Sequence, residues 1–193
     1  MTVMEVSDVQ NYDDVEVERV LLTHEQIEAK LEEVARKIDE DYLGKDLLMV
    51  AVLKGAINTM VGLNSHMHST AEMDFMSLSS YGVGMRESTG TVTVRADLTA
   101  RIKDRDILIV EDVVDSGYTL HWLANNLKQR GARSVEVFPL LTKPSRRKYD
   151  IDIKYPGYEI PDEFVVGFGL DYDERYRNLD SIVVVKPQQG DRA

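Results

Sequence analysis

The sequence predicts an α/β protein with a central parallel sheet flanked by helices. The first observation is a set of short aliphatic runs, typical of strands buried on both faces, at 46–53, 107–110 and 134–141. The second is that helical patterns of apolar residues separate these runs, which favours a parallel sheet with right-handed crossovers. Ligands of such sheets bind at the carboxyl ends of the strands, so the loops after these runs are the expected functional positions.

The first helix is expected to begin at a capping box. Thr23 and Gln26 stand at the two positions that satisfy free N–H groups at a helix start. An apolar stripe follows on one helical face: Ile27, Leu31, Val34, Ala35 and Ile38. After the strand at 46–53, a tight turn is expected at Lys54-Gly55-Ala56. A second helix then carries Ile57, Met60, Val61 and Leu63.

The elements that follow are weaker in pattern. A strand is expected around 72–80, and the polar, glycine-rich segment 81–90 is expected to be a mobile loop. Residues 91–95 alternate in the way of an edge or hairpin strand. The last two strands are expected at 164–169 and 182–185.

The stretch 107–120 carries most of the chemical information. Two adjacent carboxylates, Glu111 and Asp112, are expected to end its aliphatic strand. A loop of small polar residues follows, and from Thr119 an apolar helical stripe begins, with Gly131 where a left-handed cap would stop the helix. A strand, a small-residue loop and a helix start form an anion pocket from free N–H groups and the positive end of the helix.

Acidic side chains surround this expected anion pocket. A phosphate there would lie near Glu111, Asp112 and Asp115, and like charges about 4 Å apart repel by roughly 4 kcal/mol at an effective dielectric constant of about 20. A divalent cation between the charges would resolve the conflict, and hard oxygen ligands favour magnesium. The alternative is a ligand whose hydroxyl groups donate to the carboxylates, as a ribose diol does. Both can hold together.

Composition limits the class of protein. The chain has 193 residues, of which 43% are hydrophobic, and contains no cysteine, so disulfides are excluded. The net charge is −11, and an acidic surface repels nucleic acid. We expect an acidic, in part disordered or loosely attached segment over 1–20 and a single domain over 21–193. Without an apolar run that could span a bilayer, and with an acidic N-terminus unlike a signal peptide, we expect no membrane or nucleic-acid partner and a cytoplasmic location.

The stretch 107–120 resembles the phosphoribosyl-pyrophosphate-binding signature of the type I phosphoribosyltransferases, a hydrophobic strand followed by Glu-Asp and then Asp-Ser/Thr-Gly-x-Thr. Four other segments resemble motifs of the hypoxanthine-guanine phosphoribosyltransferases, in that family's order and spacing: 53–56, 80–82, 141–143 and 164–172. The resemblance covers about residues 23–187. It implies the type I phosphoribosyltransferase fold, with a small hood and a flexible lid loop.

The resemblance also implies a reaction. A 5-phosphoribosyl group is transferred from phosphoribosyl pyrophosphate to N9 of hypoxanthine or guanine, which gives the purine nucleotide IMP or GMP and pyrophosphate. Pyrophosphate leaves readily only when its charge is neutralised, which is the task of Mg²⁺. The resemblance further implies a homodimer or homotetramer.

Site residues follow from the same resemblance. The 5′-phosphate would be held by Asp115, Ser116, Gly117, Tyr118 and Thr119, and Asp115 would also be the general base near the purine. Glu111 and Asp112 would engage the ribose and, with Asp171, the metal. Pyrophosphate would contact Lys54, Gly55 and Arg177, with a cis peptide immediately before the lysine. The purine would be bound by Lys143, Phe164 and Val165. Ser80 and Tyr81 would be the first residues of the lid.

Other interpretations compete with these assignments. A phosphate loop can be a plain helix N-cap, and Phe164 can be a core residue. A xanthine-preferring transferase fits the same motifs, whereas Lys143 argues against an adenine-specific one because a donor would face the 6-amino group. A regulatory sensor on the same fold that binds nucleic acid would carry a basic face or a winged helix, and the sequence shows neither.

Overall fold

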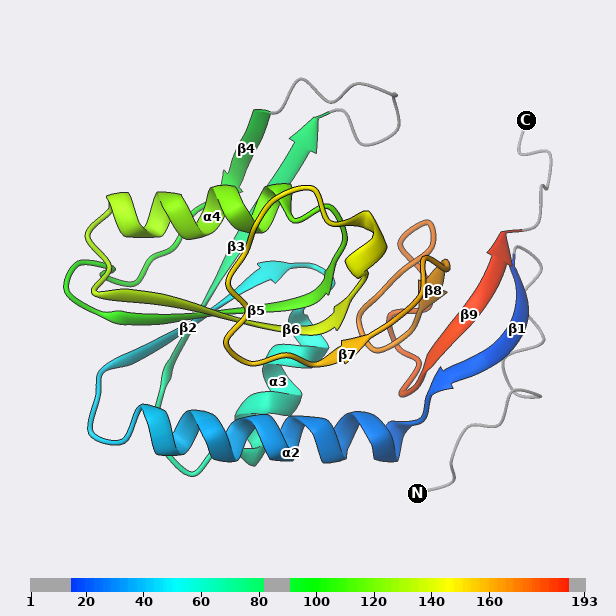
Figure 1. The fold of residues 1–193 in the computed structure, drawn as a ribbon, viewed down its shortest axis with the longest axis horizontal. Helices are drawn as coiled ribbons and strands as arrows, with labels where there is room; N and C mark the ends of the chain where they lie inside the picture. The colour runs from blue at the N-terminus through cyan, green and yellow to red at the C-terminus, as the bar shows by residue number, and fades with distance from the viewer. Residues whose placement is uncertain (1–14, 82–90, 188–193) are drawn as a thin grey trace.

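The computed structural model describes residues 15–81 and 91–187, and within these ranges the chain forms two sheets (Figure 1). The larger sheet has the strand order β4-β3-β2-β5-β6-β7. Its strands are β2 (Leu47–Leu53), β3 (Glu72–Tyr81), β4 (Thr91–Ala96), β5 (Asp106–Val114), β6 (Ser134–Thr142) and β7 (Tyr158–Glu159). All neighbours pair in parallel except β4, which lies antiparallel to β3 at the edge. The predicted parallel sheet with an edge strand after residue 90 is confirmed.

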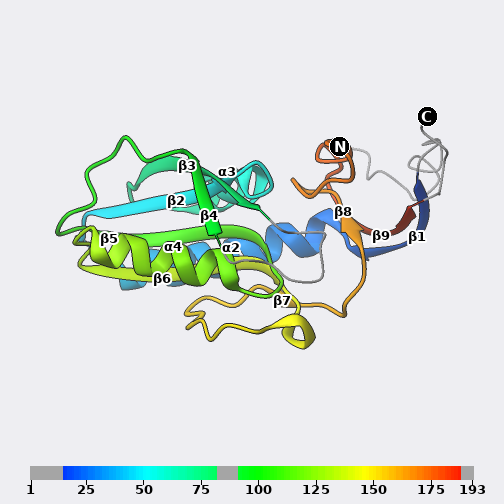
Figure 2. The same ribbon diagram turned by 90° about the horizontal axis from the view of Figure 1, so that it is seen from above.

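Helices cover both faces of this sheet. Figures 1 and 2 show α4 (Tyr118–Gln129) on one face and α2 (His24–Asp41) with α3 (Ile57–His66) on the other. Side chains of β5 alternate between the two layers, because successive residues of a strand point to opposite faces. Leu108 and Val110 pack with the core under α2 and α3, whereas Ile107 and Ile109 pack with the core under α4. Burial on both faces explains the uninterrupted aliphatic run.

The helix boundaries follow the predicted signals. Thr23 Oγ1 accepts a hydrogen bond from the Gln26 backbone, and the Gln26 side chain accepts one from the Thr23 backbone, so the capping box is confirmed. Gly131, at φ +91°, stands just beyond α4 in the left-handed conformation that was predicted there. None of the helices within 15–81 and 91–187 is long and apolar enough to cross a membrane.

The smaller sheet, which we call the hood, has the order β1-β9-β8 and is antiparallel throughout. It comprises β1 (Val15–Leu22), β9 (Ile182–Pro187) and β8 (Val165–Val166), and lies beyond one end of the larger sheet (Figures 1 and 2). Residues 15–20, the last part of the acidic segment 1–20 that was expected to be in part disordered or loosely attached, therefore belong to strand β1. The valines of β1 pack on the hood core, and two of its charged residues form ion pairs, Glu18 with Lys186 and Arg19 with Glu163. Residues 1–14 lie outside the described residues.

Two other boundaries differ from the prediction. Strand β5 continues through Glu111 and Asp112 to Val114, so the carboxylates lie within the strand instead of ending it. The strand expected at 164–169 is only two residues long, because glycines at 167 and 169 with positive φ turn the chain away from β9. Ser80 and Tyr81 are the last residues of β3, and the rest of the predicted mobile loop, 82–90, lies outside the described residues.

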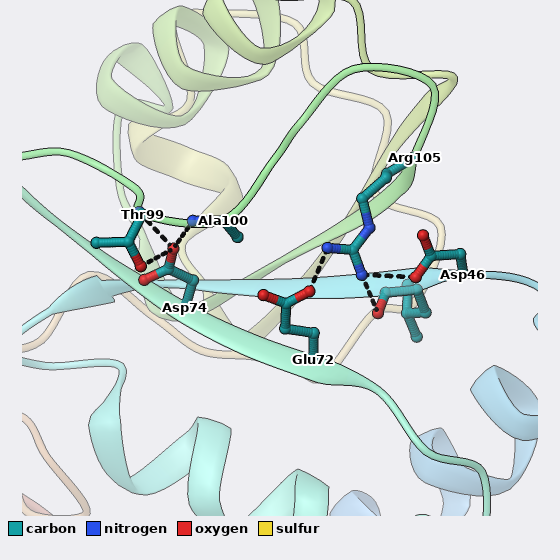
Figure 3. Close-up of polar contacts among 7 residues, drawn as sticks. Asp46, Glu72, Asp74, Thr99, Ala100 and Arg105 are labelled. Carbon is teal, nitrogen blue, oxygen red and sulfur yellow. Dashed lines mark hydrogen bonds and ion pairs between the residues drawn. The ribbon is translucent and has the colours of Figure 1, made fainter.

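Polar contacts fix the amino end of the larger sheet (Figure 3). The Arg105 side chain is 9% exposed and pairs with Glu72, with Asp46 at 2.7 Å and with the Leu47 carbonyl at 3.3 Å. The neighbouring Asp74 Oδ2 accepts hydrogen bonds from the N–H groups of Thr99 and Ala100, at 2.7 and 2.8 Å. The segment between β4 and β5 is thereby tied to β3.

The Asp74 contacts predict a pH-dependent stability. Burial opposes ionisation of Asp74, but N–H groups of Ala100, Phe75 and Thr99 outweigh this and lower its pKa below 3.8. Hydrogen bonds to a charged group contribute about 1.5–3 kcal/mol, so Asp74→Asn is expected to lower the free energy of unfolding by about 2 kcal/mol near neutral pH. Because the folded pKa is depressed, this contribution is present above pH 3.8 and is lost as the pH falls below it. Urea unfolding of the wild type and of Asp74→Asn, from neutral pH to below pH 3.8, measures this difference in the free energy of unfolding.

The matched control is Asp152→Asn at an exposed position, where a change within about 0.5 kcal/mol is expected. A neutral-pH difference for Asp74→Asn no larger than that of the control would contradict the anchoring role of Asp74.

Candidate active site

Loops from the larger sheet and the hood carry the predicted site residues. Lys54 follows β2, residues 115–119 follow β5, and Lys143 follows β6. Because these strands are parallel neighbours, their carboxyl ends lie at the same edge. The hood contributes Phe164 and Val165, and the loop between β8 and β9 contributes 171–177. The sheet and the hood thus build the site jointly.

The loop between β5 and α4 has the geometry of an anion pocket. Gly117 caps α4 at φ +82°, a conformation that favours glycine. Behind the loop, the Ser116 carbonyl accepts hydrogen bonds from the N–H groups of Lys148 and Tyr149, at 3.0 and 3.1 Å. Residues 113–120 and Glu111 line a pocket of about 130 Å³. The positive end of α4 faces this pocket and favours an anion there.

Glu111 and Asp112 occupy different parts of the site. Glu111 lines the pocket of the β5–α4 loop, whereas Asp112 lies against the turn after β2. Burial raises the pKa of Glu111 well above its usual value, and the Asp112 charge adds to this. Burial raises the pKa of Asp112 to about 6. None of the ion pairs found within 15–81 and 91–187 includes either carboxylate, so a cation or hydroxyl groups on a ligand would stabilise their charged forms.

The turn after β2 is packed too closely for any side chain at its glycine. A Cβ on Gly55 would lie 1.7 Å from Asp112 Oδ2, and a Cβ on Gly169 would lie 2.1 Å from the Gly55 carbonyl oxygen. The peptide between Leu53 and Lys54 is cis, as the resemblance implied. Gly55 therefore lies between β5 and the loop after β8, with its backbone in contact with both.

Lys54 and Arg177 share one carboxylate. Lys54 Nζ lies 2.9 Å from Glu174 Oε2, and Arg177 Nη2 lies 3.0 Å from the same oxygen. The hydrogen bond from Lys54 and the weaker one from Arg177 lower the pKa of Glu174. Arg177 also contacts Asp171 Oδ1 at 2.8 Å and donates to the Gly169 carbonyl at 2.8 Å. The three residues predicted to contact pyrophosphate are thus brought together.

The carboxylate of Asp115 lies near two basic side chains, those of Lys143 and Arg146. Its Oδ1 is buried without a hydrogen bond and lies 3.5 Å from Lys143 Nζ. Arg146 Nε lies 4.0 Å from Asp115 Oδ2 and donates from Nη1 to Asp162 at 3.1 Å. The hydrogen bond to Asp162 raises the pKa of Arg146. The carboxylate of Asp115 therefore lies between the side chains of Lys143 and Arg146.

An aromatic surface stands at the mouth of the site. The Phe164 side chain is exposed, and its ring makes an edge-on contact with Tyr172 at 5.7 Å between centroids. Val165 is buried and pairs with Val184 of β9. An exposed phenylalanine ring supported by a second ring can stack on a planar ligand, which a core position would not allow. The core interpretation of Phe164 is therefore excluded.

The predicted metal residues are not gathered into one cluster. Glu111 and Asp112 are consecutive in a strand and face opposite ways, and Asp171 pairs with Arg177. Among the described residues, no three histidine, cysteine, aspartate or glutamate side chains are grouped as metal ligands. The available donors are carboxylate oxygens, which fit a hard cation such as Mg²⁺ provided that a ligand supplies further oxygens.

Sequence reasoning missed three residues of the site. Arg146 has no assigned role in the sequence analysis, although its spacing of three residues from Lys143 could have indicated a shared face of the turn at Pro144–Arg146. Asp162, its partner, gave no signal in the sequence. Glu174 is separated from Lys54 by 120 residues, and only the folded chain brings them together.

Comparison with known proteins gives the same assignment as the motifs. The family model described as "Phosphoribosyl transferase domain" matches residues 19–173. A hypoxanthine-guanine phosphoribosyltransferase of Mycobacterium avium is 46% identical over 90% of this chain and 88% of its own. A crystal structure of a hypoxanthine phosphoribosyltransferase from Staphylococcus aureus superposes with a TM-score of 0.87 at 44% identity, covering 95% of this chain and 97% of the other.

Some relatives are longer. The bifunctional protein TilS/HprT of Listeria monocytogenes is 43% identical over 90% of this chain, which spans only 26% of that protein. The family match covers most of the chain, and the M. avium relative matches over most of its own length. This chain therefore belongs to the phosphoribosyltransferase family, within the group of the hypoxanthine-guanine phosphoribosyltransferases.

Proposed function

We propose that this chain is a Mg²⁺-dependent purine salvage enzyme, which transfers 5-phosphoribosyl from phosphoribosyl pyrophosphate to N9 of hypoxanthine or guanine. The observation that carries the proposal is the convergence of three binding features at one sheet edge. These are the anion pocket of residues 115–119, the basic pair Lys54 and Arg177, and Lys143 beside Asp115. They match a 5′-phosphate, a pyrophosphate and a purine with a 6-oxo group.

The donor is bound at two anionic ends. The N–H groups at the start of α4, with the hydroxyls of Ser116 and Thr119, bind the 5′-phosphate. Lys54 and Arg177 bind pyrophosphate, and the missing side chain at Gly55 lets the backbone approach it. Glu111 and Asp112 accept hydrogen bonds from the ribose hydroxyls between these ends.

The purine is bound between the hood and β6. Lys143, almost fully buried, donates from Nζ to the 6-oxo group, and the Phe164 ring stacks on the base. Asp115 accepts the proton that the purine loses as N9 attacks, and its buried Oδ1 has no competing hydrogen bond. An adenine 6-amino group would face the Lys143 ammonium as a second donor, so adenine is rejected.

Mg²⁺ would be held by Asp112 and Asp171 together with oxygens of the donor, and when bound it supplies neutralisation of the pyrophosphate charge. The raised pKa of Asp112 supports this assignment, because a nearby cation would favour the charged form of its carboxylate.

A direct assay tests the proposed function. The purified chain is incubated with phosphoribosyl pyrophosphate, Mg²⁺ and one base at a time, namely hypoxanthine, guanine, xanthine or adenine. Nucleotide formation with hypoxanthine or guanine is expected, and none with adenine. If the rate with xanthine exceeds the rates with hypoxanthine and guanine, the chain is a xanthine-preferring enzyme. If no base gives a nucleotide, the proposal is overturned.

Asp115→Asn tests the proton acceptor. Loss of a general base lowers kcat by about 10²–10⁴-fold. The loop N–H groups remain, so KM for the donor is expected to rise by no more than about threefold. Steady-state kinetics of nucleotide formation separate the two effects, with Asp152→Asn as the matched surface control. A raised donor KM with an unchanged kcat would show that Asp115 acts in binding alone.

Gly55→Ala tests the close approach between the turn and β5. The added methyl group would overlap Asp112 Oδ2, so the turn or the carboxylate must move by about 1 Å, and a misplacement of this size costs about 10²-fold in kcat/KM. The control is Gly44→Asn, at a left-handed position with open space around it. A fully active Gly55→Ala enzyme would contradict the proposed role of the turn.

Removal of divalent cations tests the metal requirement. Chelation with EDTA is expected to reduce nucleotide formation to background, because the acidic site then repels the polyphosphate donor. Added Mg²⁺ is expected to restore the rate. Undiminished product formation in excess EDTA would rule out the metal-dependent reaction.

A further inference from the structure

We propose that Glu174 is an internal counter-anion for the pyrophosphate site, which occupies the two cations when pyrophosphate is absent and is displaced when it binds. This inference rests on the proposed function, because it takes Lys54 and Arg177 as the residues that contact pyrophosphate. Glu174 would then set the affinity for the donor and favour release of the product, without contacting the reacting atoms.

The first support is the shared oxygen. A single atom, Glu174 Oε2, lies 2.9 Å from Lys54 Nζ and 3.0 Å from Arg177 Nη2. The two cations come from separate parts of the chain, one after β2 and one between β8 and β9. One anionic oxygen that bridges two cations at hydrogen-bond distance imitates a pyrophosphate oxygen bound between them.

The second support is the difference in burial between the partners. The side chains of Lys54 and Glu174 are 65% and 64% exposed, so their ion pair is readily exchanged for another anion. Arg177 is 23% exposed and is also held by Asp171 and the Gly169 carbonyl. Arg177 can therefore stay in place while the Glu174 carboxylate moves into solvent.

The third support is the fixed backbone at Glu174. Its N–H group donates to Asp171 Oδ2 at 2.9 Å, and a bridge between Tyr172 and Arg175 closes the turn around it. The carboxylate is thus tethered near the cations and competes as an intramolecular ligand at high effective concentration. A displaced side chain would return to Lys54 and Arg177 as soon as pyrophosphate leaves.

Because Glu174 competes with pyrophosphate, its removal should have the opposite effect on pyrophosphate affinity to removal of a residue that binds pyrophosphate. Removing the Glu174 charge is expected to strengthen pyrophosphate binding, whereas damage to the site would weaken it. The expected gain is about three- to tenfold in Kd, since each exposed ion pair contributes little and two pairs are lost.

The experiment is calorimetric titration of the full chain with inorganic pyrophosphate at fixed Mg²⁺, for the wild type and Glu174→Gln. We expect the variant to bind pyrophosphate more tightly by this factor and ribose 5-phosphate with unchanged affinity. KM for phosphoribosyl pyrophosphate should fall in parallel, and KM for hypoxanthine should not change.

Two further variants complete the design. Glu32→Gln removes the same charge from an exposed position on α2 and should leave the pyrophosphate Kd unchanged. Glu174→Asp keeps the charge on a shorter side chain and should give an intermediate Kd; it also serves as the second test if Glu174→Gln does not fold. Pyrophosphate binding by Glu174→Gln that equals or is weaker than that of the wild type overturns the inference while leaving the proposed function intact. A wild-type chain that forms no nucleotide would instead overturn the proposed function.

Discussion

The candidate site depends on the contact between two glycines and the carboxylate of Asp112. Gly169 lies against the Gly55 carbonyl, and Gly55 lies against Asp112, in each case with no room for a Cβ. This stack joins the loop after β8, the turn after β2 and strand β5. Arg177 belongs to the same loop as Gly169 and Lys54 adjoins Gly55, so the stack also brings the two cations to one carboxylate. Without this contact between Gly169, Gly55 and Asp112, the hood residues would not share a site with the larger sheet.

The distribution of charge follows from this arrangement. Two carboxylates line the interior, the buried Glu111 and the half-buried Asp112; both have raised pKa values, and neither forms an ion pair with a basic side chain of the described residues. Carboxylates nearer the surface, Asp115, Asp171 and Glu174, are each paired with lysine or arginine. A polyanionic donor can bind the lysines and arginines that pair with the surface carboxylates. The interior carboxylates instead need a divalent cation or sugar hydroxyl groups to stabilise their charge. This distribution supports the proposed donor, a phosphorylated sugar that binds together with a metal ion.

Much of the architecture could be predicted from the sequence, because it rests on local patterns. The capping box at Thr23, the aliphatic strand from 107 and the left-handed Gly131 each have a short-range cause. Strand β1 was not predicted because its charged residues obscured the valines, and two of these charged residues, Glu18 and Arg19, have their ion-pair partners far along the chain. The opposite orientation of Glu111 and Asp112 follows from the two-residue period of a strand once β5 is known to continue past them. Contacts such as Lys54 with Glu174 depend on the hood's position, for which the sequence has no local signal.

The most direct test of this account is a crystal structure of the chain with Mg²⁺ and a non-reactive analogue of phosphoribosyl pyrophosphate. We expect the 5′-phosphate on the N–H groups of residues 115–119 and the pyrophosphate between Lys54 and Arg177, with the metal on carboxylate and donor oxygens. A donor bound with its pyrophosphate away from the Gly55 turn, or with no metal at the carboxylates, would contradict it.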